Sequence, residues 1–216
     1  MKLIAAIDPV AARCAATEVA TELDGLAAQV WAFGMSEDPR RALAIVAQMG
    51  AELAMGAIQL YESGRWYAGA ALVRQLIEVE YLLFLFAHDH QEPERWLLAS
   101  SEDARRMFTP AAMRERSDGR FRSEEYSVHC EIGGHPRPQG SFLLREHFTS
   151  SNPPTVERFD PGGQWVDLAQ HIERLWTNYV EAVKWCSPHN VYPERFQKVD
   201  AALVRWRAID KVPPKI

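Results

Sequence analysis

Helical periodicity on both sides of one irregular segment constrains the fold of this chain most. Residues 8–117 and 164–210 repeat apolar side chains at intervals of three and four residues, the pattern of one helix face. Residues 118–163 hold 6 of the 12 Gly, 5 of the 13 Pro and 3 of the 7 His. No pair of alternating strands joined by a hairpin signature is present. The sequence therefore predicts an all-α fold, an elaborated antiparallel helix bundle with an irregular insert containing Gly, Pro and His.

Capping residues and helix breakers predict where the helices begin and end. The segment 66–88 is apolar on most sides, so it is predicted to be the central helix, buried all round. Small residues at 68–71 would let a neighbour approach it closely. The first helix is predicted from Asp8-Pro9 to Gly34 and the second from Ser36–Pro39 to Ser63-Gly64. A fourth helix is predicted to begin at Pro93 and to be interrupted at Thr109-Pro110, and a short helix is predicted from Ser123 to Gly133-Gly134. Loops are predicted at 150–154 and 161–163, followed by two late helices, the last of which begins at Pro193.

Length and composition indicate one helical domain over residues 1–216, with a tail at 211–216. The chain is 47% hydrophobic and 25% charged, which is enough apolar mass for a core. Its net charge of -5 gives no basic footprint, so duplex DNA is not an expected partner. The first residues are too short an apolar run for a signal peptide, and 66–87 carries charges that argue against a membrane span. Three scattered cysteines suggest no disulfide framework, and we expect a cytoplasmic protein.

The first candidate site is Arg74 with Glu78 on the central helix. Four residues apart, the two side chains share a helix face, whereas Glu80 points elsewhere. Charges in such an apolar helix are costly unless they are paired. Two interpretations stay open: a buried ion pair that fixes helix register, or a pair that lines a polar ligand pocket.

The second candidate site is the segment 126–136, in which hydroxyl, imidazole, thiol and carboxylate side chains lie close together. His129 shares a helix face with Glu125, and near-neutral imidazoles suit acid–base chemistry. Cys130 has no nucleophile signature around it. A metal would draw on Glu125, His129, Glu131, His135 and either His147 or His171. The duplicated Glu-x-x-His motif of bundle carboxylate sites is absent, so no metal and no cofactor is predicted.

Two resemblances follow from these residues. The run 72–78 with its Arg-x-x-x-Glu, and the later 131–136 ending in His-Pro, resemble an uncharacterised family of all-helical bacterial proteins over roughly residues 40–185. Arg122 and His129, six residues between them, resemble the Arg…His motif of HEPN domains. That resemblance implies a metal-independent ribonuclease of a toxin or phage-defence type. In it, His129 would move the proton of the ribose 2′-hydroxyl and Arg122 would stabilise charge on the phosphate.

Three functions are compatible with the sequence. The first is a self-association or partner-binding module, a homo-oligomer or a protein's partner, because seven Trp is a high count and Trp favours interfaces. The aromatics outside the predicted core stripes are Trp31, Trp66, Trp165, Trp176 and Trp185. The second is the ribonuclease, with RNA as substrate and with Arg122, His129 and His135 as catalytic candidates. The third is a small-molecule or metal-binding pocket protein, whose binding candidates are Arg74, Glu78, Tyr126 and Glu131.

Overall fold

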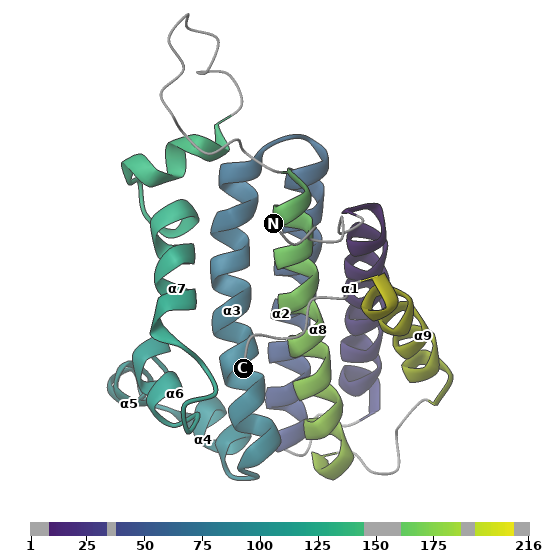
Figure 1. Cartoon of the computed structure of the whole chain (residues 1–216). Coiled ribbons are helices and arrows are strands. Elements are labelled where there is room, and N and C mark those ends of the chain that lie inside the picture. Colours follow the sequence, from purple (N-terminus) through teal and green to yellow (C-terminus); the bar gives the residue numbers. More distant parts are fainter. Residues whose placement is uncertain (1–8, 34–37, 145–160, 187–192, 210–216) are drawn as a thin grey trace, which may run out of the picture.

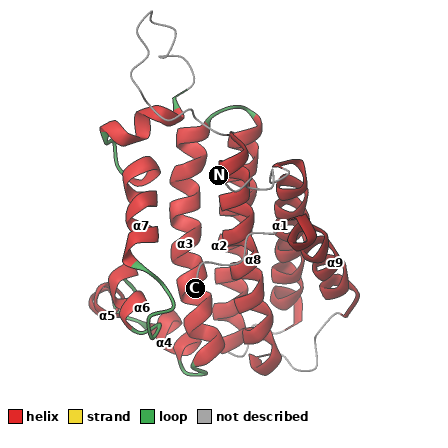
Figure 2. Cartoon of the chain, in the orientation of Figure 1, coloured by secondary structure: helices red, strands yellow, loops and turns green. Residues whose placement is uncertain are grey.

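The computed structural model describes residues 9–33, 38–144, 161–186 and 193–209, and the regular elements in these ranges are all helical (Figure 2). Four long helices run side by side: α1 (Pro9–Phe33), α2 (Asp38–Glu62), α3 (Trp66–His88) and α8 (Pro161–Cys186). The last helix, α9 (Pro193–Ile209), packs on the outer side of α1 (Figure 1). The predicted all-α bundle is confirmed.

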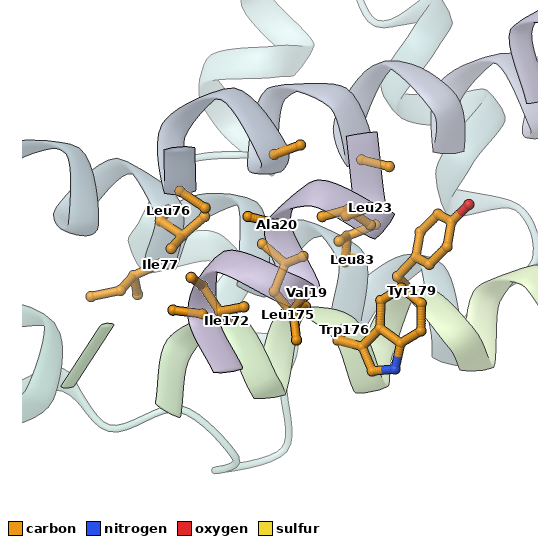
Figure 3. Packing of buried hydrophobic residues seen from close by; sticks show 14 of the residues in the cluster. Val19, Ala20, Leu23, Leu76, Ile77, Leu83, Ile172, Leu175, Trp176 and Tyr179 are labelled. Carbon is orange, nitrogen blue, oxygen red and sulfur yellow. The ribbon is translucent and has the colours of Figure 1, made fainter. Parts of the chain in front are cut away.

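The core lies where α1, α3 and α8 meet (Figure 3). Leu23 from α1, Leu76 from α3 and Leu175 from α8 are each at most 1% exposed. The apolar side chains that repeat along α8 at three- and four-residue intervals are all buried: Leu168, Ile172, Leu175, Tyr179, Ala182 and Cys186. Helix α3 is central because it contacts α2, α8 and the insert. On α2, Met49 belongs to the same kind of periodic apolar pattern but is 48% exposed. By length and composition α2 could cross a membrane, yet half of its apolar window is buried in the bundle.

Three short helices close one end of the bundle: α4 (Glu92–Leu98), α5 (Ser101–Met107) and α6 (Pro110–Glu115) (Figure 1). The sequence predicted one helix from Pro93 to the Thr109-Pro110 break, and this prediction is wrong. A new helix begins at Ser101, because the Ser100 hydroxyl accepts the Asp103 backbone N–H at 3.1 Å and caps it. The predicted break at Thr109-Pro110 is confirmed, with the Thr109 hydroxyl capping α6.

The insert is more regular than predicted. It contains α7 (Ser123–His129), a π-helical turn η1 (Cys130–Gly134) and a 3-10 helix η2 (Pro138–Leu143). The turn η1 packs backbone to backbone on α3, because Gly133 has no side chain to separate it from Ala70. The helix α8 begins at Pro161, where a loop was predicted; proline suits the first helical position, since it has no N–H to leave unpaired.

The tryptophans are mostly packing residues. Trp165 and Trp176 are buried, and Trp66 and Trp185 are half-buried against the core. Trp165 meets the Trp66 and Tyr61 rings edge-on, and Trp185 stacks on His90. The prediction that Trp165 and Trp176 are exposed interface residues is therefore wrong. Several predictions fall outside the described residues: those on Asp8, Gly34, Ser36, His147, 150–154, the 211–216 tail and the Trp31 side chain.

Candidate metal centre between three helices

Two imidazoles and a carboxylate converge between α7 and α8. The Nε2 atom of His129 lies 3.2 Å from the Nε2 atom of His171. The Asp167 Oδ1 atom is 3.5 Å from His129 Nε2 and 3.7 Å from His171 Nε2. Both histidines are buried, and the Asp167 side chain is about a third exposed. Three potential ligand atoms therefore face one point at the edge of the core.

The spacing of these three atoms matches that of ligands around one metal ion. In a tetrahedral zinc site with ligands at about 2.0–2.1 Å, ligand atoms are separated by about 3.3 Å. The three separations here, 3.2, 3.5 and 3.7 Å, place a common point about 2.0 Å from each atom. By these three distances alone, the ligand atoms can hold a first-row divalent cation without movement of the helices.

Helix geometry explains why these residues meet. His129 follows Glu125 by four residues on α7, and His171 follows Asp167 by four residues on α8. Side chains four apart lie on the same face of a helix. Helices α7 and α8, which both pack on α3, thus each carry an acid–histidine pair, and the two pairs meet through their side chains. The predicted common face of Glu125 and His129 is confirmed, because both side chains contact His171.

A buried carboxylate on α3 orients His171 from behind. The Glu80 side chain is 1% exposed, and its Oε2 atom lies 2.8 Å from His171 Nδ1. A proton on Nδ1 that is donated to Glu80 would leave the Nε2 lone pair directed at His129 and Asp167; in this tautomer the Arg174 guanidinium, whose Nη2 atom is 2.7 Å from Nδ1, does not donate to the ring. Metal-binding histidines usually have such a carboxylate partner, which fixes the ring and raises its basicity.

Burial sets the charges of this pair. It lowers the pKa of His171 to about 3, so the imidazole is neutral near pH 7 and able to bind a cation. Burial also raises the pKa of Glu80 to about 8, against the opposing effect of the Arg174 guanidinium. Without a cation, a proton on Glu80 can be donated to Nδ1. A cation beside Nε2 favours the ionised Glu80 and the tautomer with the proton on Nδ1.

The guanidinium of Arg174 bridges the two glutamates. Its Nε atom is 3.0 Å from Glu80 Oε1, its Nη2 atom is 2.7 Å from Glu125 Oε1, and Nη2 is also 2.7 Å from His171 Nδ1. Burial would raise the pKa of Glu125, but Arg174 outweighs it and holds that pKa below its usual value. With Glu80 ionised, as a bound cation favours, three carboxylates and one guanidinium carry two surplus negative charges. A divalent cation would balance them.

A second polar network joins α3 to the same short helix. Tyr126 donates to Glu78 Oε1 at 2.6 Å and accepts from Arg74 Nη2 at 2.7 Å. Arg74 and Glu78 form the predicted pair on one face, with Nη2 and Oε1 2.8 Å apart. Burial and the bond to Glu78 raise the pKa of Tyr126, so the phenol keeps its proton. Because all three groups are paired with one another, the network anchors α7 to α3.

The structure brings together some of the predicted site residues and separates others. His129 belongs to the metal cluster, and Tyr126 joins Arg74 and Glu78. His135 is exposed and its backbone oxygen accepts from Tyr67. Glu131 and Arg122 are exposed as well, and no contact links either of them to His129 among the described residues.

Sequence reasoning missed Glu80, Asp167 and Arg174, and named His171 only as one of two alternatives. The detectable signal was Asp-x-x-x-His in the late helix, which repeats the Glu-x-x-x-His of residues 125–129. Known metal sites in helix bundles use Glu-x-x-His, in which the two ligands are three residues apart. In both pairs of this chain the acid and the histidine are four residues apart, so the known motif did not reveal them. Glu80 carries no sequence signal, since only packing shows that it faces His171.

Comparisons of the chain with protein-family models, curated protein sequences and solved structures find no match.

Proposed function

We propose that this protein binds one divalent transition metal, zinc in the first instance, through His129, Asp167 and His171. The observation that supports it is the triangle of ligand atoms with a common point about 2.0 Å from each. The buried Glu80 behind His171 supports it independently.

The ligand set favours a reactive centre over a purely structural one. Structural zinc sites close all four positions with protein ligands, mostly cysteine, whereas catalytic sites use three and leave one open. Here three protein atoms converge. A metal in such a position polarises a bound water or a substrate oxygen. The chain's own residues supply the ligands, the orientation of His171 and a water-poor surrounding.

Metal titration of purified protein tests the proposal. After removal of metal with EDTA and dialysis, isothermal titration with Zn²⁺ should give one site per chain. We expect His129→Asn and Asp167→Asn to weaken binding by at least 10-fold, by analogy with the cost of losing even an outer-shell partner. His135→Asn and Asp200→Asn are matched controls on exposed residues and should bind zinc as the wild type does.

Absence of stoichiometric zinc binding in folded wild-type protein would refute the proposal. So would unchanged affinity in both His129→Asn and Asp167→Asn. Circular dichroism of each variant ensures that a loss of binding is not a loss of folding. Titration with Fe²⁺ and Mn²⁺ ranks the metals, because two imidazoles and a carboxylate also suit iron.

Self-association is a second candidate, favoured by an apolar hollow between α2 and α3. Its volume is about 690 Å³, and Met49, Leu53, Trp96 and Phe108 are among its lining residues. Its walls carry both signs of charge, with Glu52 on α2 and Arg74 on α3, which suits a two-fold pairing of identical copies. Light scattering should then show a dimer that Met49→Glu dissociates; a wild-type monomer would exclude it.

The HEPN-type ribonuclease is the remaining proposal. It requires Arg122 to act beside His129, and no observation in the described residues favours that pairing. Cleavage of a labelled RNA in EDTA, lost in His129→Ala and in Arg122→Ala, would support it. Under the metal proposal, EDTA-treated protein should leave the RNA intact.

A further inference from the structure

We propose that Arg174 holds Glu125 away from the metal, and so keeps one coordination position open to a small oxyanion or a water molecule. This inference rests on the proposed metal centre and deepens it, because it names the class of ligand that the centre takes from solution.

Glu125 lies just outside the set of three ligand atoms. Its Oε1 atom is 4.0 Å from His171 Nε2, compared with the 3.2–3.7 Å that separate the three convergent atoms. Toward His171 alone, a shift of about 0.7 Å would bring Oε1 to the ligand–ligand spacing of a tetrahedral site. Instead Oε1 is bound to Arg174 Nη2 at 2.7 Å. The carboxylate therefore has two competing partners, the guanidinium and the metal.

The guanidinium is itself fixed from the inside of the bundle. Its Nε atom lies 3.0 Å from Oε1 of Glu80, which is almost fully buried on α3. Moving Arg174 toward solvent would separate the guanidinium from the buried Glu80 side chain, its partner on α3. The position of Arg174 is therefore set by Glu80, and the position of Glu125 is set by Arg174.

The open position faces solvent on the carboxylate side of the centre. The side chains of Asp167, Glu125 and Arg174 are 34–36% exposed, whereas those of His129 and His171 are 7% and 1% exposed. A ligand can therefore approach only past the carboxylates and the guanidinium. With a divalent metal bound, the charges of three carboxylates, one guanidinium and the metal cancel. A small oxyanion thus meets a cation and a guanidinium without net repulsion.

Azide binding to the cobalt-substituted protein tests the inference. Co²⁺ reports its coordination in the visible spectrum, and azide is a small anionic probe that needs an open position. We expect saturable spectral changes in the wild type. Arg174→Met frees Glu125 to bind the metal, so azide affinity should fall at least 10-fold. The double variant Arg174→Met/Glu125→Gln no longer has the competing carboxylate. Its azide affinity should therefore recover at least half of the loss, measured as the change in the logarithm of Kd.

Two further variants make the outcome decisive. Glu124→Gln changes an exposed neighbour outside the cluster and should leave azide affinity unchanged. Should Arg174→Met fail to fold, Arg174→Lys keeps the charge without the planar fork, and azide affinity should fall by a smaller factor. No response of wild-type Co²⁺ protein to azide, or equal affinity in wild type and the Arg174 variant, would overturn the inference. Failure of Co²⁺ to bind would instead refute the metal centre itself.

Discussion

A pair of adjacent glycines gives the sharpest test of how η1 positions the site. Gly133 and Gly134 follow His129 by about one turn, and both are in helical conformation, with neither at positive φ. Alanine at either position would gain about 1 kcal/mol of helix propensity. The two positions differ only in what a new Cβ atom would contact.

At Gly133 the obstacle is the backbone of α3. A Cβ there would lie 2.6 Å from the Ala70 carbonyl carbon and 2.8 Å from its oxygen, where ordinary contact begins at 3.4 Å. Helix α3 packs against α2 and α8 on its other faces, although Ala68 and Gln75 are exposed, so η1 must move outward by about 0.8 Å. Overpacking of this kind costs about 1–3 kcal/mol. After the propensity gain, we expect Gly133→Ala to destabilise the fold by about 0–2 kcal/mol.

At Gly134 the obstacle is a side chain that can move. Its Cβ would lie 2.5 Å from Arg74 Cδ, a methylene of a flexible chain. Arg74 can shift while keeping its pairing with Glu78, so we expect Gly134→Ala to change stability by less than about 1 kcal/mol. Gly133→Ala should lower the Tm by up to about 8 °C, given about 2–4 °C per kcal/mol for a chain of this size.

Urea denaturation of both variants in EDTA, followed by circular dichroism, measures the difference without any metal contribution. A Gly133→Ala variant as stable as Gly134→Ala, or more stable, would refute the close packing of η1 on α3. Because η1 continues directly from His129, Gly133→Ala should also weaken zinc binding more than Gly134→Ala does, which a parallel titration checks.

Three other outcomes are expected. Zinc at 100 times its Kd should stabilise the wild type by about 2.7 kcal/mol in thermal melts, and at the same zinc concentration a 10-fold weaker Asp167→Asn should gain about 1.4 kcal/mol at most. Tyr126→Phe removes two hydrogen bonds to partly exposed charged groups, so it should lower the free energy of unfolding by about 1–2 kcal/mol in urea titrations. Tyr67→Phe removes one hydrogen bond to a backbone oxygen and should lower it by less. Leu76→Ala should lower the free energy of unfolding by about 2–5 kcal/mol because Leu76 is fully buried. Val204 is 60% exposed, so Val204→Ala should change the free energy of unfolding by no more than about 0.5 kcal/mol. Equal losses of stability in the two variants would contradict the assigned core.

The helices themselves were predictable because their signals are local. Periodicity and caps gave the third helix as residues 66–88, the extent that the structure shows for α3. The Arg74–Glu78 pair was predictable for the same reason, since four residues of helix bring both side chains to one face. Local rules failed at Ser100, where a cap divides the fourth helix, and at Pro161, where proline begins a helix instead of ending a loop.

The candidate site was only half predictable. The sequence alone determined that Glu125 and His129 share one face of a short helix, because that depends on helix geometry within a few residues. Only the tertiary structure decided that this face meets Asp167 and His171, residues about forty positions away, and that Glu80 lies behind them. Helix packing sets such contacts through the shapes of whole faces, so no spacing in the chain encodes them. The same packing leaves the side chains of His135 and Arg122 exposed. The sequence had associated both residues with His129, which is buried beside His171.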